Sequence, residues 1–246
     1  MNETLQLLHN HRSIRKFTSE KLTKDEVRTI VEAGQRASTS SNIMAYSVIG
    51  ITDETLKKEL RAISGQPYVE KNGYLFVICA DLSRVSLLDS AEEYETIRTN
   101  LESTESFILA VVDAALVTQN MVIAAESMGL GAVFLGSLRN DINRVDELLQ
   151  LPDYVIPLFG LAVGHPDHEP NIKPRLPFEA VFHENTYEKD KLNFIESYDQ
   201  TMENYYKQRN SNTRDDNWTK QMIRKFSVPT RLDVADYVRK KKFNKQ

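Results

Sequence analysis

The sequence predicts an α+β protein in which a few strands are sandwiched by longer helices. Short apolar runs bounded by turn residues alternate with segments in which apolar residues recur at helical spacing. The longest helical segment runs from about Glu105 to Met128 and is followed by Gly129, a residue type that commonly ends helices. This segment is apolar along most of its length, so we expect it to be a buried helix.

The first half of the chain is expected to begin with a short helix over residues 3 to 10. Thr23 and Glu26 have the spacing of a capping box, so a second helix begins there and runs to about Arg36. A hydroxyl-rich run at 38–41 favours a turn, because its side chains compete for backbone partners. The other elements expected in this half are a strand over 46–52, a helix over 53–63, a loop over 65–68 and a buried strand over 74–80.

The second half alternates in the same way, and Pro157 favours an edge position or a bulge for the strand that contains it. From residue 184 onward the composition becomes polar. The elements expected here are a strand over 132–135, a helix over 141–149, a strand over 154–163, an extended loop over 167–177, a helix near 190–208, a loop over 209–217 and a helix near 231–241.

The bulk composition limits the partners of this chain. Its 246 residues are 41% hydrophobic, and its net charge of -4 gives no general attraction to nucleic acid or an anionic membrane. Asp113 and Glu126 interrupt the long apolar helix and would be costly in lipid, so no membrane span is expected. The single cysteine, Cys79, lies in an apolar run and predicts a buried thiol, which fits a reducing, cytoplasmic setting. The N-terminus has no signal-peptide pattern.

The sequence lacks the motifs of several common nucleotide-binding, metal-binding and catalytic sites. The run from Gly129 to Phe134 begins like a dinucleotide fingerprint but lacks the third glycine, and it precedes a strand instead of following one. Ser137 stands where a P-loop needs lysine. Five scattered histidines form no recognisable metal set, and no serine-hydrolase elbow is present. We therefore expect any chemistry to reside in a cofactor.

Two basic clusters are candidate anion sites. The first comprises His11, Arg12, Ser13 and Arg15, and the second is Lys173-Pro174-Arg175, in which proline stiffens the backbone between two cations. Taken alone, either cluster is also compatible with an ordinary basic turn that faces water.

The order of motifs along the whole chain resembles the nitroreductase superfamily, and within it the NADPH-preferring flavin reductases and oxygen-insensitive nitroreductases. The resemblance implies a central, mostly antiparallel sheet flanked by helices, a core over residues 1–184 and a C-terminal extension over 185–246 that wraps the partner of a homodimer. It also implies bound FMN at the subunit interface. The motifs that carry it are HRSIRKF, the Ser/Thr cluster, GQPYV, QNMVIAAESMGLG, VFLGSLRN, LFGLAVGHP, KPRLP, HEN and YYKQRNSNTRDDNW.

The resemblance assigns FMN contacts to both ends of the flavin. His11, Arg12 and Ser13, with Lys173 and Arg175, would bind the phosphate and ribityl end, where charge-assisted hydrogen bonds suit a dianion. Arg15 would approach the N1/O2 edge of the ring, where a cation raises the flavin potential. The further FMN contacts implied are Ser38, Thr39, Ser40, Gln66, Tyr68, Phe134, Gly136 and Ser137.

Glycine at 136 allows backbone to come close to the flavin ring, whereas relatives often carry a second glycine where this chain has Ser137. Hydroxyl runs such as 38–41 are equally often plain turns. Arg209 and Arg214 resemble the basic loop that binds the 2′-phosphate of NADPH, although Asp215 and Asp216 follow directly.

The function implied is ping-pong hydride transfer from NADPH through FMN N5 to small, flat, electron-poor acceptors such as nitroaromatics, quinones or free flavin. No catalytic side chain is expected, because the flavin carries the chemistry. A flavin-binding or flavin-storage protein without turnover is the alternative, and a protein that binds another anionic ligand is a third.

Overall fold

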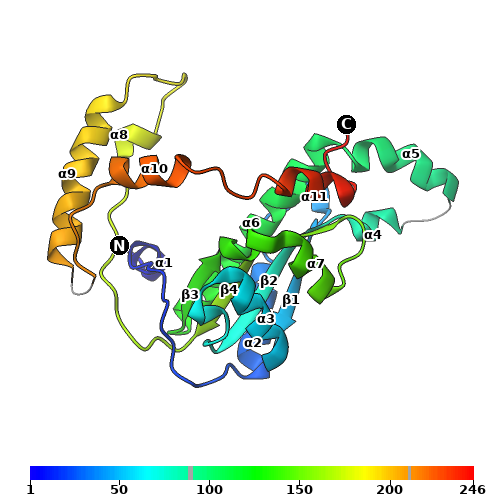
Figure 1. Cartoon of the computed structure of the whole chain (residues 1–246), viewed down its shortest axis with the longest axis horizontal. Coiled ribbons are helices and arrows are strands. Elements are labelled where there is room, and N and C mark those ends of the chain that lie inside the picture. Colours follow the sequence, from blue (N-terminus) through cyan, green and yellow to red (C-terminus); the bar gives the residue numbers. More distant parts are fainter. Residues whose placement is uncertain (88–90, 210–211) are drawn as a thin grey trace. The chain divides into compact units, whose positions relative to one another are not determined.

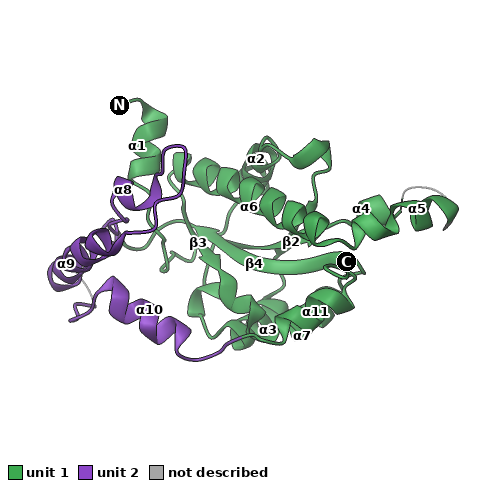
Figure 2. Cartoon of the chain, turned by 90° about the horizontal axis from the view of Figure 1, so that it is seen from above, with its two compact units in different colours: residues 1–168, 231–246 green, residues 169–230 purple. Residues whose placement is uncertain are grey.

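The computed structural model describes residues 1–87, 91–209 and 212–246, which fold into two compact units (Figures 1 and 2). Unit 1 comprises residues 1–168 and 231–246, and unit 2 comprises residues 169–230. The division into a core over 1–184 and an extension over 185–246 stays a prediction.

Unit 1 is built on a single four-stranded sheet with the strand order β1-β2-β4-β3. Every neighbouring pair is antiparallel, which confirms the α+β class and the antiparallel sheet. The strands are β1 (Tyr46–Ile51), β2 (Tyr74–Asp81), β3 (Gly131–Leu135) and β4 (Val155–Gly164).

Pro157 lies in β4, an inner strand, and of the two structures expected for it the bulge is the one found. Ile78 pairs with Phe159, but the next residue, Cys79, pairs with Pro157, so Leu158 is the extra residue. The carbonyl of Leu158 accepts a hydrogen bond from the Arg139 guanidinium. Proline has no N–H to donate to the strand ladder, and the bulge allows it to lie inside a central strand.

Helices cover both faces of the sheet, so its inner strands are apolar along most of their length, with Asp81 at the end of β2 as the charged exception (Figure 2). On β2, Phe76 and Ile78 face the cluster that includes α2 and α6, whereas Leu75 and Val77 face the cluster that includes α3 and α7. The helices of this unit are α1 (Glu3–His9), α2 (Lys24–Gly34), α3 (Glu54–Ser64), α4 (Ser83–Ser86), α5 (Ala91–Leu101), α6 (Thr104–Ser127), α7 (Ile142–Leu149) and α11 (Val234–Lys240).

Short 3-10 helices η1 (Ser40–Asn42), η2 (Pro67–Val69) and η3 (Gly136–Asp141) lie in three of the connections that carry predicted site residues. The predicted capping box of α2 is present: Thr23 Oγ1 accepts from the N–H of Glu26 at 3.2 Å, and the Glu26 carboxylate accepts from the N–H of Thr23 at 2.7 Å. Helices α4 and α5 lie where the sequence predicts no element.

Helix α6 is long and apolar enough, by length and composition, to cross a membrane. In this chain it packs on α2 and the sheet, as the core helix of a globular domain does (Figure 2). Gly34 of α2 allows this contact, because a Cβ there would lie 2.6 Å from Cγ of Met121. The long buried helix predicted from the sequence is therefore confirmed, while one stripe of it stays exposed at Ile108, Val112 and Leu116.

Unit 2 has a small core of its own, made by Tyr198, Met202 and Tyr206 with Trp218 packed against them. Its helices are α8 (Phe178–Val181), α9 (Leu192–Gln208) and α10 (Trp218–Phe226). Helix α9 agrees with the helix expected near 190–208, whereas α10 follows directly on the predicted loop and was not expected.

Candidate functional site

The segment that carries the first basic cluster is fixed to β3, the edge strand of the sheet. The N–H of Ile14 donates to the carbonyl of Ala132 on β3 at 3.0 Å, and the Ile14 side chain is 5% exposed. A Cβ on Gly131 would lie 2.5 Å from Cγ1 of Ile14, so only glycine lets the segment approach β3 this closely. Because neighbouring side chains alternate, Ser13 and Arg15 point away from that buried contact.

The same segment stays attached further along. The N–H of Thr18 donates to the carbonyl of His165 at 3.0 Å, and Phe17 forms a β-bridge with Pro166. Backbone bonds within the cluster at Ile14 and just after it at Phe17 and Thr18 therefore hold the basic cluster in one position, as a preorganised anion site requires.

At the start of the cluster, His11 contacts the last turn of α6. Its Nδ1 lies 2.6 Å from Oε1 of Glu126, and both side chains are largely shielded from water. This contact orients the imidazole through Nδ1. Arg12 is half-buried, and its Nε donates to the carbonyl of Asn10 at 3.1 Å, whereas Arg15 is exposed.

The hydroxyl turn at 38–41 is held by Asp113, which is not among the residues predicted for the site. Asp113, 1% exposed on α6, accepts the N–H of Ser40 at 3.0 Å and the N–H of Ala45 at 3.1 Å. Between these two bonds the backbone is left-handed at Ser41 (φ 47°) and Asn42 (φ 57°), and again at Met44. Such conformations persist only where the surroundings impose them. Ser38 and Ser40 are exposed and Thr39 is half-buried.

The structure brings together the two other loops predicted to line the flavin. Ser64 Oγ, at the end of α3, lies 2.5 Å from Ser137 Oγ, and the Asn140 side chain donates to the carbonyl of Ile63 at 3.3 Å. The loop with Gln66 and Tyr68 follows directly on α3, so it lies close to the turn after β3. The Ser137 hydroxyl, whose role the sequence left open, thus bonds to Ser64.

At the end of β3, Phe134 and Gly136 have the exposure that a ligand contact needs. Phe134 is 41% exposed and its ring lies 5.4 Å from that of Phe159. A Cβ on Gly136 would come no closer than 3.3 Å to a protein atom, the flexible end of Arg139. Packing within the chain therefore does not require glycine here, and the close approach of a ligand to Gly136 stays a prediction.

In unit 2, the second basic cluster is exposed but ordered by local bonds. Arg175 Nη1 donates to the carbonyl of Lys173 at 2.9 Å. The Tyr198 hydroxyl donates to the carbonyl of Pro174 at 2.9 Å, which ties the cluster to α9. The two cationic groups therefore project from a segment held by its backbone.

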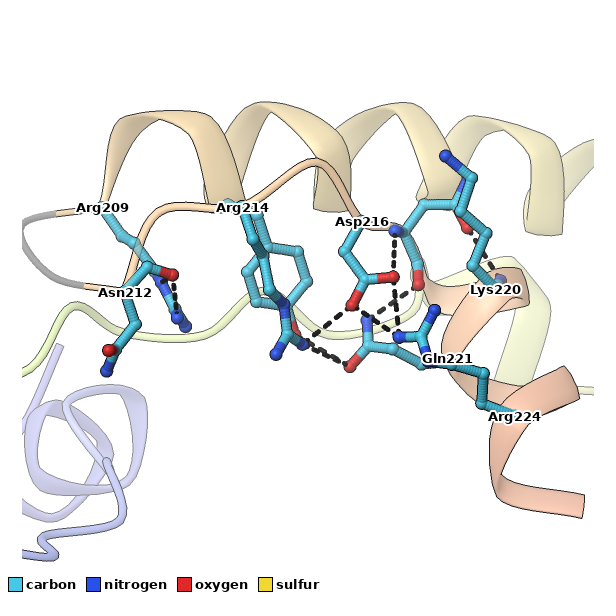
Figure 3. A network of polar contacts seen from close by, with 9 residues as sticks. Arg209, Asn212, Arg214, Asp216, Lys220, Gln221 and Arg224 are labelled. Atoms are coloured by element: carbon cyan, nitrogen blue, oxygen red, sulfur yellow. Dashed lines mark hydrogen bonds and ion pairs between the residues drawn. The ribbon is translucent and has the colours of Figure 1, made fainter. Parts of the chain in front are cut away.

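The loop predicted to bind NADPH is organised by Asp216, which is 3% exposed (Figure 3). Its carboxylate lies 2.9 Å from the Arg214 guanidinium and 2.8 Å from that of Arg224. Burial raises the pKa of Asp216, but its hydrogen bonds from Arg224 and the charge of Arg214 outweigh it, so the pKa lies below its ordinary value. Arg209 donates through Nε to the carbonyl of Asn212 at 2.7 Å.

From the sequence, Asp216 is a negative charge next to the predicted phosphate-binding arginines, but in the structure its carboxylate pairs with two arginines. Its neighbour Asp215 is exposed. A buried carboxylate shared by two guanidinium groups orders the loop and leaves an excess of positive charge.

The fold and these basic segments define a protein of the nitroreductase family, and the chain belongs to it. The model described as "Nitroreductase family" matches residues 8–165, and "Nitroreductase family, C-terminal domain" matches residues 173–246.

Relatives match along the full chain. A Bacillus subtilis (strain 168) protein named FMN reductase (NADPH) is 49% identical over 249 residues, covering 100% of both chains. An NADPH-dependent oxidoreductase of Staphylococcus aureus (strain MRSA252) is 48% identical over 95% of both.

Solved structures agree with these matches. The NfrA1 nitroreductase of B. subtilis is similar with a TM-score of 0.93 and 48% identity, over 99% of this chain and 100% of that one. The NADPH:FMN oxidoreductase of Vibrio harveyi, complexed with NAD+, is similar with a TM-score of 0.88 and a sequence identity of 38%, over 100% of both chains. The resemblance drawn from the sequence motifs is thus confirmed at the level of family and fold.

Proposed function

We propose that this chain is an NADPH-dependent oxidoreductase that holds FMN and reduces flat, electron-poor acceptors such as nitroaromatics, quinones or free flavin. The observation that carries the proposal is the basic segment from His11 to Arg15, which backbone bonds fix against β3. It occurs in a chain that matches, over its whole length, a relative named FMN reductase (NADPH). When bound, FMN would supply the hydride chemistry between NADPH and the acceptor.

The side chains present fit a flavin mononucleotide. A phosphate dianion needs several charge-assisted donors, and the exposed or half-buried guanidinium and ammonium groups supply them. We assign the phosphate end to Arg12 and Ser13, and also to Lys173 and Arg175, as the resemblance implies. His11 would act through Nε2, because Nδ1 contacts Glu126.

The isoalloxazine end of the flavin is assigned to residues beside β3 and in the turn that follows it. Arg15 would raise the potential of the flavin by placing a cation at its N1/O2 edge, and Gly136 would admit the ring close to backbone. The remaining proposed contacts are Ser38, Thr39, Ser40, Gln66, Tyr68, Phe134 and Ser137. None of these groups needs to act as an acid or base; they orient the ring and exclude water from it.

Arg209 and Arg214 are proposed to recognise the 2′-phosphate of NADPH. The ion pair with Asp216 holds the Arg214 guanidinium in one position. Arg214 would therefore contribute positive charge to the site from a fixed position. Discrimination against NADH then follows from the dianion that NADH lacks.

We propose that the active protein is a homodimer, with each flavin at the subunit interface. The apolar stripe Ile108, Val112 and Leu116 of α6 stays 51%, 48% and 42% exposed, at a spacing that places all three on one helix face. A second copy of the chain is the partner assigned to it. A cytoplasmic location is proposed because Cys79 is buried and unpaired.

The test is FMN affinity measured by quenching of flavin fluorescence. Replacing Arg12 or Arg175 by alanine removes a charge-assisted contact, each worth about 1.5–3 kcal/mol, so affinity is expected to fall about tenfold or more for each. Arg36→Ala, at an exposed arginine after α2, is the matched control. Unchanged affinity in the double variant R12A/R175A would refute the phosphate assignment.

A further inference from the structure

Tyr206 is a residue that no functional assignment above uses, although it lies at the centre of the unit 2 cations. It occupies the last turn of α9 and is 2% exposed, packed with Tyr198 and Met202. The face of such a ring can attract cations that lie over it.

Three cationic groups surround the Tyr206 ring. The Arg214 guanidinium carbon lies 4.3 Å from the ring centroid, that of Arg209 lies 5.0 Å away, and the Lys173 ammonium lies 5.9 Å away. All three are within the roughly 6 Å over which a ring face attracts a cation. Lys173 precedes α9 in the chain and the two arginines follow it, so the ring joins two separate segments.

The hydroxyl end of Tyr206 adds a polar anchor. It donates to Oε1 of Gln221 at 3.0 Å, and the same oxygen accepts from Arg214 Nη2 at 3.2 Å. Figure 3 shows Gln221 beside Arg214 and Asp216, so Arg214 is held by an amide, a carboxylate and a ring at once.

The electrostatics agree with this arrangement. Burial raises the pKa of Tyr206, yet Lys173, Gln221 and Arg214 together outweigh burial, and the pKa lies below its ordinary value. The cationic groups around Tyr206 therefore outweigh the effect of its burial, in agreement with a site for a phosphate dianion.

We propose that Tyr206 is the positioning residue of the NADPH site, whose ring holds Arg209 and Arg214 in place for the 2′-phosphate and also supports Lys173. The inference rests on the proposed function and deepens it: reductant specificity depends on an aromatic support as well as on the cations. Since one ring contacts residues assigned to both phosphates, its loss should weaken NADPH recognition strongly and FMN binding slightly.

The experiment compares Y206L and Y206F with the wild-type holoenzyme, measuring the KM for NADPH and for NADH at a saturating quinone acceptor. Leucine removes two arginine–ring contacts, each equivalent to about a two- to fivefold change in affinity. The KM for NADPH should therefore rise about 4- to 25-fold in Y206L, with kcat and the KM for NADH changed less than about threefold. Phenylalanine keeps the ring, so Y206F should raise the KM for NADPH by no more than about threefold.

Y205L is the matched control, because Tyr205 is the adjacent tyrosine of the same helix and its ring packs edge-on against Tyr206. Its KM values are expected to stay within about threefold of wild type. The FMN dissociation constant, from flavin fluorescence, should rise about two- to fivefold in Y206L, as loss of the Lys173 contact predicts.

Equal increases in the KM for NADPH and for NADH in Y206L would overturn the inference, since a general loss of structure would cause them. A large effect of Y206F would overturn it as well, even if Y206L were not recovered folded, because the ring would then not be the support. If the wild type itself failed to discriminate NADPH from NADH, the 2′-phosphate assignment would fail and this inference with it. A wild type that discriminates, with a Y206L that discriminates equally well, would refute the role of Tyr206 alone.

Discussion

Asp113→Asn perturbs one buried carboxylate that fixes the hydroxyl turn. The carboxylate accepts two backbone N–H groups, from Ser40 and Ala45. Asparagine has one acceptor oxygen, so one bond becomes neutral and the other N–H is left facing an amide nitrogen. Weakening the first bond costs about 1 kcal/mol and leaving a buried N–H unsatisfied costs about 1–3 kcal/mol. The expected loss of unfolding free energy is about 2–4 kcal/mol.

The assay is urea unfolding of the FMN-free protein, in which an unchanged m-value shows that stability alone has changed. The turn itself is followed by amide exchange at Ser40 and Ala45, which should lose their protection. Asp236→Asn is the control, because Asp236 is exposed and its Oδ1 lies 3.5 Å from Nη1 of Arg239. Loss of this surface ion pair should change the free energy of unfolding by less than about 0.5 kcal/mol. A D113N variant within that margin of wild type, with both amides still protected, would refute the reasoning.

Three further predictions follow from the same structure. Gly131→Ala should displace the segment at Ile14, because the new Cβ would lie 2.5 Å from Cγ1 of Ile14. FMN binding should weaken as a result. Wild-type FMN affinity of this variant in a fluorescence titration would contradict the role given to the basic cluster. Burial raises the pKa of the Cys79 thiol, so an aromatic disulfide reagent should leave the native protein unlabelled and label it fully in urea; rapid native labelling would contradict the burial. In the folded protein the pKa of Asp216 lies below its usual value of 3.8. As the pH falls, the carboxylate is therefore protonated in the unfolded chain before it is protonated in the folded one. The stability that the ionised Asp216 contributes above pH 3.8 is lost as the pH falls through the folded pKa. Urea unfolding across that range should show a shallower acid decline for D216N, and equal declines would exclude this linkage.

Local signals predicted most of the fold. The Thr23–Glu26 capping box and Gly129 after α6 act through residues within a turn of one another, and both lie at helix ends in the structure. Helix α10 was missed although its signal was present, since the Asn217 side chain caps it by accepting the N–H of Lys220 at 2.8 Å. Helix α5 has weak apolar periodicity and many charges, so its sequence does not distinguish it from a solvated loop.

The candidate site depended on tertiary contacts that spacing cannot predict. The sequence shows Asp113 as a charge inside an apolar helix, but its bond to Ser40 joins residues 73 positions apart. Tyr206 looks like an ordinary apolar-face tyrosine of a helix, and its contact with Lys173 becomes visible only when α9 and the preceding loop are placed. The motif order predicted the family because it reflects the whole chain at once.

The central claim is that NADPH reduces a flavin held by this chain. The most direct measurement is an anaerobic titration of the purified, FMN-loaded protein with NADPH, followed through the visible flavin absorbance. We predict that the yellow colour is bleached by one equivalent of NADPH per flavin and returns on addition of a quinone. A yellow protein that NADPH leaves unbleached would contradict the claim and favour flavin storage, and a protein that does not bind FMN would contradict the flavin assignment altogether.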